Sequence, residues 1–231
     1  MLTSYSNVFV GISLANKTLT PQGVKYILDF AASEFECRRL VFLVADQLNL
    51  INLRVFESGS HDTLSKKVYQ ESETFIECIK VGLASWSGSI EFIDIITWNQ
   101  ILDRGYWNAY MKIFSQFIQN TIFQKDLEDI ARKFARGRGK GDDMASVHYL
   151  STYLISELPT LLEGIRYKNK IYSSMVYPTY HGEAMDEIAK GIVAGRYGLF
   201  HDIEYKCQIK HLFLSSDGHP TSSSAIPGAK S

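Results

Sequence analysis

Residues 7–20 read NVFVGISLANKTLT, a short, β-branched apolar run that leads into a polar turn containing Ser13. Such a run is typical of a buried strand. Thr20 and Pro21 then supply an N-cap and a first-turn proline, which predicts a helix to about residue 36. This stretch therefore predicts a strand, a turn and a helix, which is the opening unit of an α/β fold.

The same alternation continues downstream. We expect buried strands at 39–46 and 89–98, with an amphipathic helix over 61–85 between them. Strands separated by helices in this order predict a parallel sheet with right-handed crossovers. Further elements are expected at 104–164 (helices), 170–178 (strand), 183–195 (helix) and 207–215 (strand). The predicted fold class is α/β, with one Rossmann-like domain over 1–215 and a mainly parallel sheet, followed by a Ser/Gly/Pro-rich tail at 216–231 that we expect to be disordered.

The charge balance is close to neutral. The 231 residues include 24 Lys and Arg and 25 Asp and Glu, which gives a formal net charge of −1. This excludes a protein that is basic over its whole surface, so any basic patch must be local. The length fits one large domain with a substantial core.

The three cysteines, Cys37, Cys78 and Cys207, are widely spaced and form no CxxC pair. This pattern favours free thiols in a reducing compartment over a disulfide framework or a zinc site. The first residues, MLTSYSN, do not resemble a signal peptide, and no apolar run is long enough to span a membrane. We expect a cytoplasmic protein with no metal site and no membrane partner.

Ser13 is the first candidate for chemistry. Ligands of doubly wound folds lie beyond the carboxyl ends of the strands, where Ser13 stands, and Gly11 beside it leaves room for a substrate. The alternative, which position alone favours, is a serine that only caps a turn. The stretch has no GxGxxG fingerprint, and Ala15 stands where a GxSxG elbow needs glycine.

The second candidate is YLISELP, in which Tyr153 and Glu157 lie four residues apart on a predicted helix. This spacing places a phenol and a carboxylate on one face, where they could hold an ammonium group together. The alternative is a solvated glutamate beside a core tyrosine. Pro159 is expected to kink or end this helix.

The third candidate is MVYPTYHG, in which Tyr177 ends a predicted strand and would face the same crevice as Ser13. Tyr180 and His181 follow directly, and a single histidine in such a loop is more often structural than catalytic.

A run of cations separated by glycines covers 131–141. The run fits two interpretations equally well. It could bind a phosphate backbone, or it could be a solvated helix end whose cations offset the helix dipole. The helix at 61–85 carries few lysines among several acids and is a poor phosphate track. The cations of the run are Arg132, Lys133, Arg136, Arg138 and Lys140.

These stretches, taken in order, resemble motifs of the tRNA-dependent cyclodipeptide synthases. VGISLAN resembles that family's Gly-x-Ser-x-x-Asn segment, with Ser13 at the nucleophile position. YLISELP resembles its Tyr-x-x-x-Glu-x-Pro helix, and SSMVYP resembles the strand that carries a further catalytic tyrosine, here Tyr177. The chain departs from the family pattern by combining Asn16 with Tyr177-Pro178, features of different branches.

The resemblance implies a fold similar to the catalytic domain of class I aminoacyl-tRNA synthetases, without their ATP signatures. It implies an aminoacyltransferase that needs no cofactor and joins the aminoacyl groups of two aminoacyl-tRNAs into a cyclic dipeptide by a ping-pong reaction. Nothing in the sequence suggests an obligate subunit seam, so we expect a monomer. Ser13 would store the first aminoacyl group, and Tyr153 and Glu157 would clamp its ammonium. Tyr177 would assist proton transfer.

The resemblance also implies further binding residues. Asn16 would help to stabilise the oxyanion, Tyr106 would line the cleft, and Arg138 would steady the aminoacyl end. The helix at 61–85 is strongly basic in some relatives but weakly so here, so we expect the run from Arg132 to Lys140 to contact tRNA instead. The first side chain would occupy a pocket built from Phe9, Gly11, Val44, Thr160 and Met175.

Two other functions stay open from the residues alone. One is a non-catalytic RNA- or nucleotide-binding module on a Rossmann-like core. The other is a serine acyltransferase or hydrolase that uses His148, His181 or His201 as its base. Both leave the Tyr-x-x-x-Glu helix unexplained.

Overall fold

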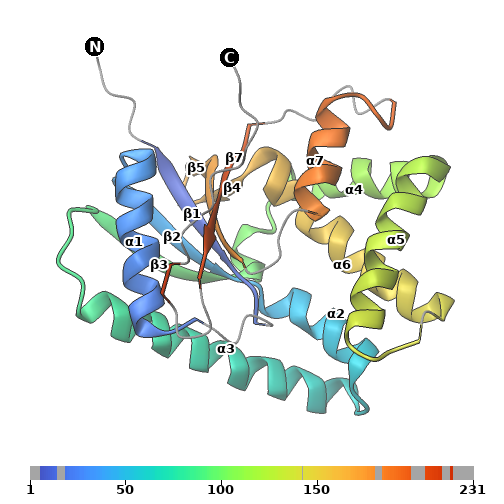
Figure 1. The fold of residues 1–231 in the computed structure, drawn as a ribbon, viewed down its shortest axis with the longest axis horizontal. Helices are drawn as coiled ribbons and strands as arrows, with labels where there is room; N and C mark the ends of the chain where they lie inside the picture. The colour runs from blue at the N-terminus through green and yellow to red at the C-terminus, as the bar shows by residue number, and fades with distance from the viewer. Residues whose placement is uncertain are drawn as a thin grey trace.

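Five parallel strands form the central sheet in the order β3-β2-β1-β6-β7 (Figure 1). The computed structural model describes residues 6–14, 19–141, 143–179, 184–198, 206–214 and 219–220. The strands are β1 (Asn7–Ile12), β2 (Arg39–Val44), β3 (Phe92–Thr97), β6 (Ser174–Thr179) and β7 (Gln208–Phe213), and a separate hairpin joins β4 (Ile165–Tyr167) to β5 (Lys170–Tyr172). The helices are α1 (Pro21–Phe35), α2 (Asp46–Phe56), α3 (His61–Ala84), α4 (Arg104–Gln119), α5 (Thr121–Gly137), α6 (Met144–Glu163) and α7 (Ala184–Val193), with a 3₁₀ turn η1 at Trp98–Ile101.

The strand order places a switch point beside β1. The chain passes from β1 to β2 and β3 on one side and reaches β6 and β7 only later, on the other side. Connections that leave in opposite directions open a crevice at the carboxyl ends of the two central strands. The end of β1 therefore lies where this class of fold binds ligands.

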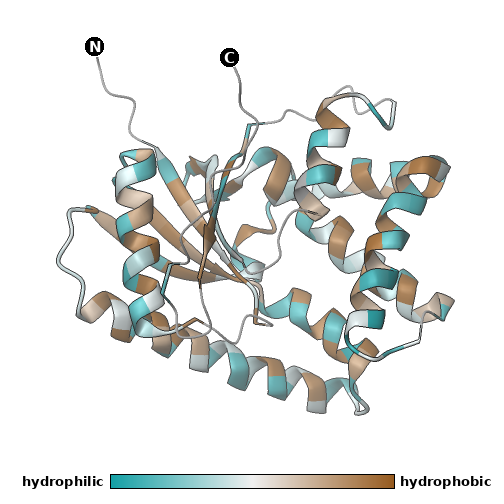
Figure 2. Ribbon diagram, in the orientation of Figure 1, coloured by the Kyte–Doolittle hydropathy of each residue, from teal (hydrophilic) through white to brown (hydrophobic). Residues whose placement is uncertain are grey.

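Side-chain alternation along the strands divides the core into two layers. Val8 and Val10 of β1 pack with α1 and α3, whereas Phe9 between them packs with the helices of the opposite face. In Figure 1, α1 and α3 lie on one side of the sheet and α2, α4, α5, α6 and α7 on the other. Figure 2 shows that the central strands are mostly hydrophobic, while an outer helix such as α3 alternates between hydrophobic and hydrophilic residues.

Helix α6 lies at the centre of the second layer, where it contacts α2, α4, α5 and α7. Of the two outcomes expected at Pro159, a kink or an end of the helix, the end is not observed, since α6 continues to Glu163. Proline removes one backbone N–H and displaces the carbonyls of the preceding turn. In this part of α6, the carbonyl of Ser156 accepts a 2.9 Å hydrogen bond from the phenol of Tyr106, which ties the helix to α4.

The helix start at Thr20 is confirmed, since the Thr20 hydroxyl accepts a hydrogen bond from the amide of Gly23 at 3.0 Å. Two assignments differ from expectation. Helix α2 was not predicted, and the expected strand at 170–178 is divided into β5, which turns back on β4, and β6, which joins the sheet. Within the expected tail, the structure describes only His219 and Pro220, and Pro220 forms a bridge with Leu214.

Candidate active site

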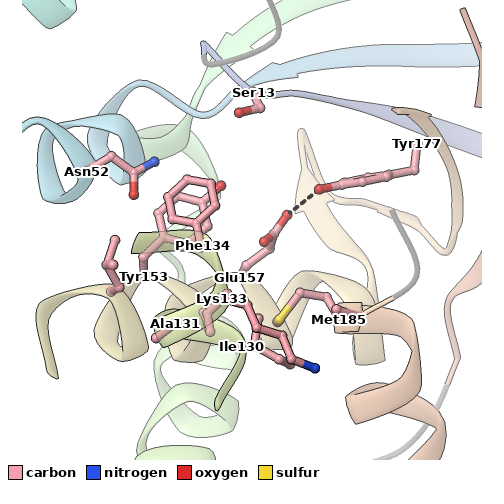
Figure 3. Close-up of a pocket in the computed structure, with 13 residues that line it drawn as sticks. Ser13, Asn52, Ile130, Ala131, Lys133, Phe134, Tyr153, Glu157, Tyr177 and Met185 are labelled. Carbon is pink, nitrogen blue, oxygen red and sulfur yellow. Dashed lines mark hydrogen bonds between the residues drawn. The ribbon is translucent and has the colours of Figure 1, made fainter. Parts of the chain in front are cut away.

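A cavity of about 470 Å³ opens at the carboxyl end of β1, between the sheet and helices α2, α5, α6 and α7. Ser13, Tyr153, Glu157 and Tyr177, the four residues predicted to be catalytic, all line it (Figure 3). They come from the turn after β1, two successive turns of α6, and β6. The tertiary structure thus brings together residues from three stretches, the first and last of which lie more than a hundred residues apart in the chain.

Ser13 and Tyr153 form the first half of the site. The side chain of Tyr153 is partly buried, and its desolvation raises the pKa of the phenol. The negative charge of Glu157 also raises this pKa, whereas hydrogen bonding from Ser13 and the positive charge of Arg138 lower it. Because the net shift is upward, Tyr153 is a neutral phenol at physiological pH.

Glu157 and Tyr177 form the second half. The Tyr177 phenol donates a hydrogen bond to Oε1 of Glu157 at 3.3 Å, drawn as a dashed line in Figure 3. Glu157 is only 8% exposed, so its carboxylate faces the cavity and not bulk water. A buried carboxylate with a phenol donor is a suitable receptor for a small cationic group such as an ammonium.

The remaining walls of the cavity are mostly apolar. They are built from one face of α5 and from α6 and α7, so the cavity offers a hydrophobic space next to a polar cluster. Most ligand sites have this combination of apolar walls and a few placed polar groups. The apolar wall residues are Ile130, Ala131, Phe134, Leu150, Leu154, Ala184 and Met185.

Asn52 of α2 also lines the cavity, and it was not among the site residues expected from the sequence. It is 3% exposed, and its Oδ1 has no hydrogen-bond partner among the described residues. A signal was present in the sequence. Leu48, Asn52 and Val55 follow the i, i+4, i+7 spacing of a buried helix face, and an asparagine that interrupts an apolar stripe marks a polar group placed inside.

The predicted side-chain pocket is not the observed cavity. Phe9, Val44, Thr160 and Met175 are at most 2% exposed and belong to the packed core. Val44 packs on the α1 and α3 side of the sheet, because its position on β2 alternates with that of Leu43. This corrects the expectation that Val44 contributes to a pocket beside Ser13.

Gly11 has a structural role in the site that differs from the expected one. A Cβ added at this position would lie 2.5 Å from Cε of Met175 and 3.7 Å from Cδ2 of Tyr177. The space above Gly11 is therefore filled by these two side chains and is not left open for a substrate. The absence of a side chain at Gly11 makes room for the end of the Met175 side chain, whereas the ring of Tyr177 would remain at ordinary contact distance from a Cβ.

Tyr106 lies outside the cavity and lines a second one, together with Trp98, Trp107 and Tyr110. Burial raises the pKa of Tyr106 to about 12, and the residue holds the α6 backbone through Ser156. This corrects the expectation that Tyr106 lines the same cleft as Ser13. Asn16 lies outside the described residues.

No protein-family model and no curated protein sequence matches the chain. Solved structures do match over nearly its whole length. A cyclodipeptide synthase from Fluoribacter dumoffii matches with a TM-score of 0.68 and 14% identity, over 89% of this chain and 88% of that one. One from Streptomyces noursei matches with a TM-score of 0.64 and 13% identity, over 92% and 97%.

The fold is that of the cyclodipeptide synthases. A third match, from Mycobacterium tuberculosis, has a TM-score of 0.63 and 11% identity over 89% of this chain and 84% of that one. The work on that structure demonstrates that cyclodipeptide synthetases are related to type I tRNA synthetases. The predicted fold class and its likeness to class I synthetases are therefore confirmed.

On this cyclodipeptide synthase fold, the cation run occupies the end of α5 and the turn that follows. Arg132 is already engaged with two acids of its own helix, Glu128 at 2.8 Å and Asp129 at 3.0 Å. Arg138 lies over the rings of Phe134 and Phe56, at 4.6 and 5.3 Å from their centroids.

The other cations of the run differ in position. Lys133 lines the cavity, while Arg136 and Lys140 are exposed at the surface. The run therefore combines one neutralised arginine with cations that face the cavity or the surface.

In the described part of the chain, none of the candidate histidine bases lines the cavity. His148 is exposed on α6 and does not line the cavity, and His181 and His201 lie outside the described residues. No three His, Cys, Asp or Glu side chains of the described residues lie close enough to share a metal ion. Among the helices the structure describes, none is long and apolar enough to cross a bilayer.

The cysteines are free thiols, as expected. Cys37 and Cys207 are buried, and burial raises the pKa of Cys37 to about 12. Cys37 is therefore protonated and a poor nucleophile at neutral pH.

Proposed function

We propose that this protein is a tRNA-dependent cyclodipeptide synthase in which Ser13 is the acyl acceptor. The observation that carries the proposal is the convergence of Ser13, Tyr153, Glu157 and Tyr177 on one cavity, in a fold whose solved neighbours are cyclodipeptide synthases. Fold alone does not fix an activity, so the proposal rests on the chemistry of these side chains in this arrangement.

The first step is an exchange of esters. Ser13 Oγ attacks the carbonyl carbon of an aminoacyl-tRNA ester, and the bond to the ribose oxygen breaks. The proton of Ser13 passes to the departing ribose oxygen, with the neutral phenol of Tyr153 as a relay that accepts one proton and donates its own. One ester replaces another, so the step needs no ATP.

The ammonium of the aminoacyl group is held by the carboxylate of Glu157 with the phenols on either side of it. The low exposure of Glu157 strengthens this attraction, because water screens it weakly. The same carboxylate is placed to take a proton from the ammonium, which converts it into a nucleophilic amine.

Two aminolysis steps complete the reaction. The amine on the Ser13 ester attacks the ester of a second aminoacyl-tRNA, which forms a peptide bond and releases the second tRNA. The free amine of the resulting dipeptide then attacks the Ser13 ester, so the ring closes and the Ser13 hydroxyl is restored. Tyr177, hydrogen-bonded to Glu157, is placed to assist the proton transfers.

The decisive experiment supplies the protein with a mixture of aminoacyl-tRNAs. Intact mass spectrometry is expected to detect an aminoacyl adduct, and chromatography with mass spectrometry a cyclic dipeptide. Ser13→Ala should lose both, whereas the control Ser33→Ala, at an exposed position of α1, should keep both. An adduct that persists in Ser13→Ala, or turnover of simple esters without tRNA and without a cyclic product, would refute the proposal.

A further inference from the structure

Asn52 carries a polar group that the proposed reaction does not use. Its side chain extends from α2 toward the ring side chains of the cavity (Figure 3). The residue is 3% exposed, and its Oδ1 has no hydrogen-bond partner within the described part of the chain. The wall of the cavity therefore contains a buried acceptor without a hydrogen-bond partner among these residues.

Folded proteins rarely leave such an acceptor unsatisfied, because burying a carbonyl away from water destabilises the folded state unless the carbonyl gains a hydrogen-bond partner. The cost is acceptable when a ligand supplies the missing donor. Asn52 meets this condition, because it is buried, its Oδ1 lacks a hydrogen-bond partner in the part of the chain that the structure describes, and it lies in the wall of the cavity that contains Ser13.

We propose that Asn52 is a specificity-determining residue that accepts a hydrogen bond from the side chain of the aminoacyl group bound in this cavity. The inference rests on the proposed function. It assigns the substrate class as an aminoacyl group with a large, mainly apolar side chain that carries one hydrogen-bond donor. The phenol of tyrosine is the matched probe, because phenylalanine differs from it only by the hydroxyl.

The composition of the cavity sets both halves of this preference. The apolar walls from α5, α6 and α7 favour burial of an aromatic or long aliphatic body. Ring contacts with Phe134 add to this for an aromatic side chain. A small polar side chain would leave much of the 470 Å³ space unfilled.

The polar half of the preference comes from the acceptor itself. A side chain without a donor would leave the Oδ1 carbonyl buried and unpaired. Sites built around a hydrogen bond reject the analogue that lacks it much more strongly than apolar pockets reject a missing methylene.

The chain offers a matched control on the same helix. Asn49 lies one turn before Asn52, is 7% exposed and does not line the cavity. Its Nδ2 donates a 2.9 Å hydrogen bond to Oε2 of Glu71, so its polar group already has a partner. Asn49→Leu therefore removes a buried asparagine from α2 without touching the site.

The experiment compares tyrosyl-tRNA with phenylalanyl-tRNA as acyl donors, each alone and in competition. The rate of adduct formation on Ser13 is followed by intact mass spectrometry, and the cyclic products are identified. The wild type is expected to prefer tyrosyl-tRNA by at least about tenfold, in line with one buried hydrogen bond. Asn52→Leu should abolish or reverse this preference, and Asn49→Leu should keep it.

The outcomes separate this inference from the proposed function. The inference would be overturned, and the function left intact, if both probes formed adducts or cyclic dipeptides equally well. The same would hold if products formed only from side chains without a donor. An equal loss of both rates in Asn52→Leu, with the ratio unchanged, would also overturn it, because the carboxamide would then serve folding or hold a water. If Asn52→Leu fails to fold, the wild-type ratio still decides. No adduct and no product with any aminoacyl-tRNA would refute the function, and the inference with it.

Discussion

The phenol of Tyr177 donates to Oε1 of Glu157 at 3.3 Å, a hydrogen bond that joins β6 to α6 across twenty residues of sequence. Neither residue sits on a surface loop. Glu157 is on a helix surrounded by other helices, and Tyr177 is on a strand paired on both sides in the central sheet. The position of the acid relative to Ser13 is therefore set by the packing of a helix against the sheet, which favours a preorganised site.

Glu157→Gln is expected to slow adduct formation and cyclic dipeptide formation by about 10²-fold or more, because the amide can neither balance an ammonium nor accept its proton.

Tyr177→Phe is expected to slow cyclic dipeptide formation more than adduct formation. Single-turnover mass spectrometry of both species checks this. Tyr110→Phe, in the second cavity, serves as the control. If the Glu157→Gln variant reacted at wild-type rates, Glu157 would have no role in the reaction.

Charge reversal at Arg136 and Arg138 should weaken the binding of several different tRNAs alike. It should also reduce the slope of log affinity against log salt by about one for each phosphate that is no longer neutralised. Arg132→Gln should change little, because Arg132 is already paired with Glu128 and Asp129. Lys66→Glu on α3 is the control for charge on another face. If Lys66→Glu weakened tRNA binding more than the variants at Arg136 and Arg138, tRNA would bind to the α3 face instead.

Gly164→Ala is expected to destabilise the protein much more than Gly139→Ala. Both glycines have a positive φ, of +76° and +72°, which L side chains rarely adopt, so both substitutions should cost about 1–3 kcal/mol in backbone conformation. A Cβ at Gly139 would meet no described atom within 4 Å, whereas one at Gly164 would overlap the backbone carbonyl of Tyr172. The overlap should add about 1–3 kcal/mol. Urea unfolding measures the difference, and equal losses would contradict the packing of the end of α6 against β5.

Asp94 gives a stability that depends on pH. Burial raises the pKa of this carboxyl, but hydrogen bonds from Lys168 and Tyr167 outweigh burial and the net shift is downward. A lowered pKa stabilises the fold above the ordinary value of about 4, and this stabilisation is lost as the pH falls through the folded value. Asp94→Asn should therefore cost up to about 1 kcal/mol near pH 7 and less in acid.

Denaturant unfolding at several pH values checks this prediction, with Glu73→Gln at an exposed position of α3 as the control. A destabilisation that stays constant down to about pH 2 would show that the carboxylate charge is not what Lys168 and Tyr167 bind.

Several elements could be predicted from local patterns, because their determinants lie within a few residues of one another. The cap at Thr20 and the apolar runs that became β1, β2 and β3 are of this kind. Helix α2 was missed because it follows β2 almost without a break and its apolar stripe is interrupted by Asn52. The path of α6 through Pro159 could not be predicted either, because contacts that hold this part of the helix, such as the hydrogen bond from Tyr106 to the carbonyl of Ser156, come from another helix.

The amino-acid sequence by itself determined the alternation of strands and helices, apart from α2 and the β4–β5 hairpin, and the four residues that resemble a catalytic set. Periodicity, caps and motif spacing are properties of short segments. Only the tertiary structure decided that Ser13, Glu157 and Tyr177 line one cavity, that Val44 and Tyr106 lie outside it, and that Asn52 lies inside. The physical reason is that the distance between residues far apart in the chain is set by how helices pack against the sheet. That packing depends on the shapes of many side chains at once.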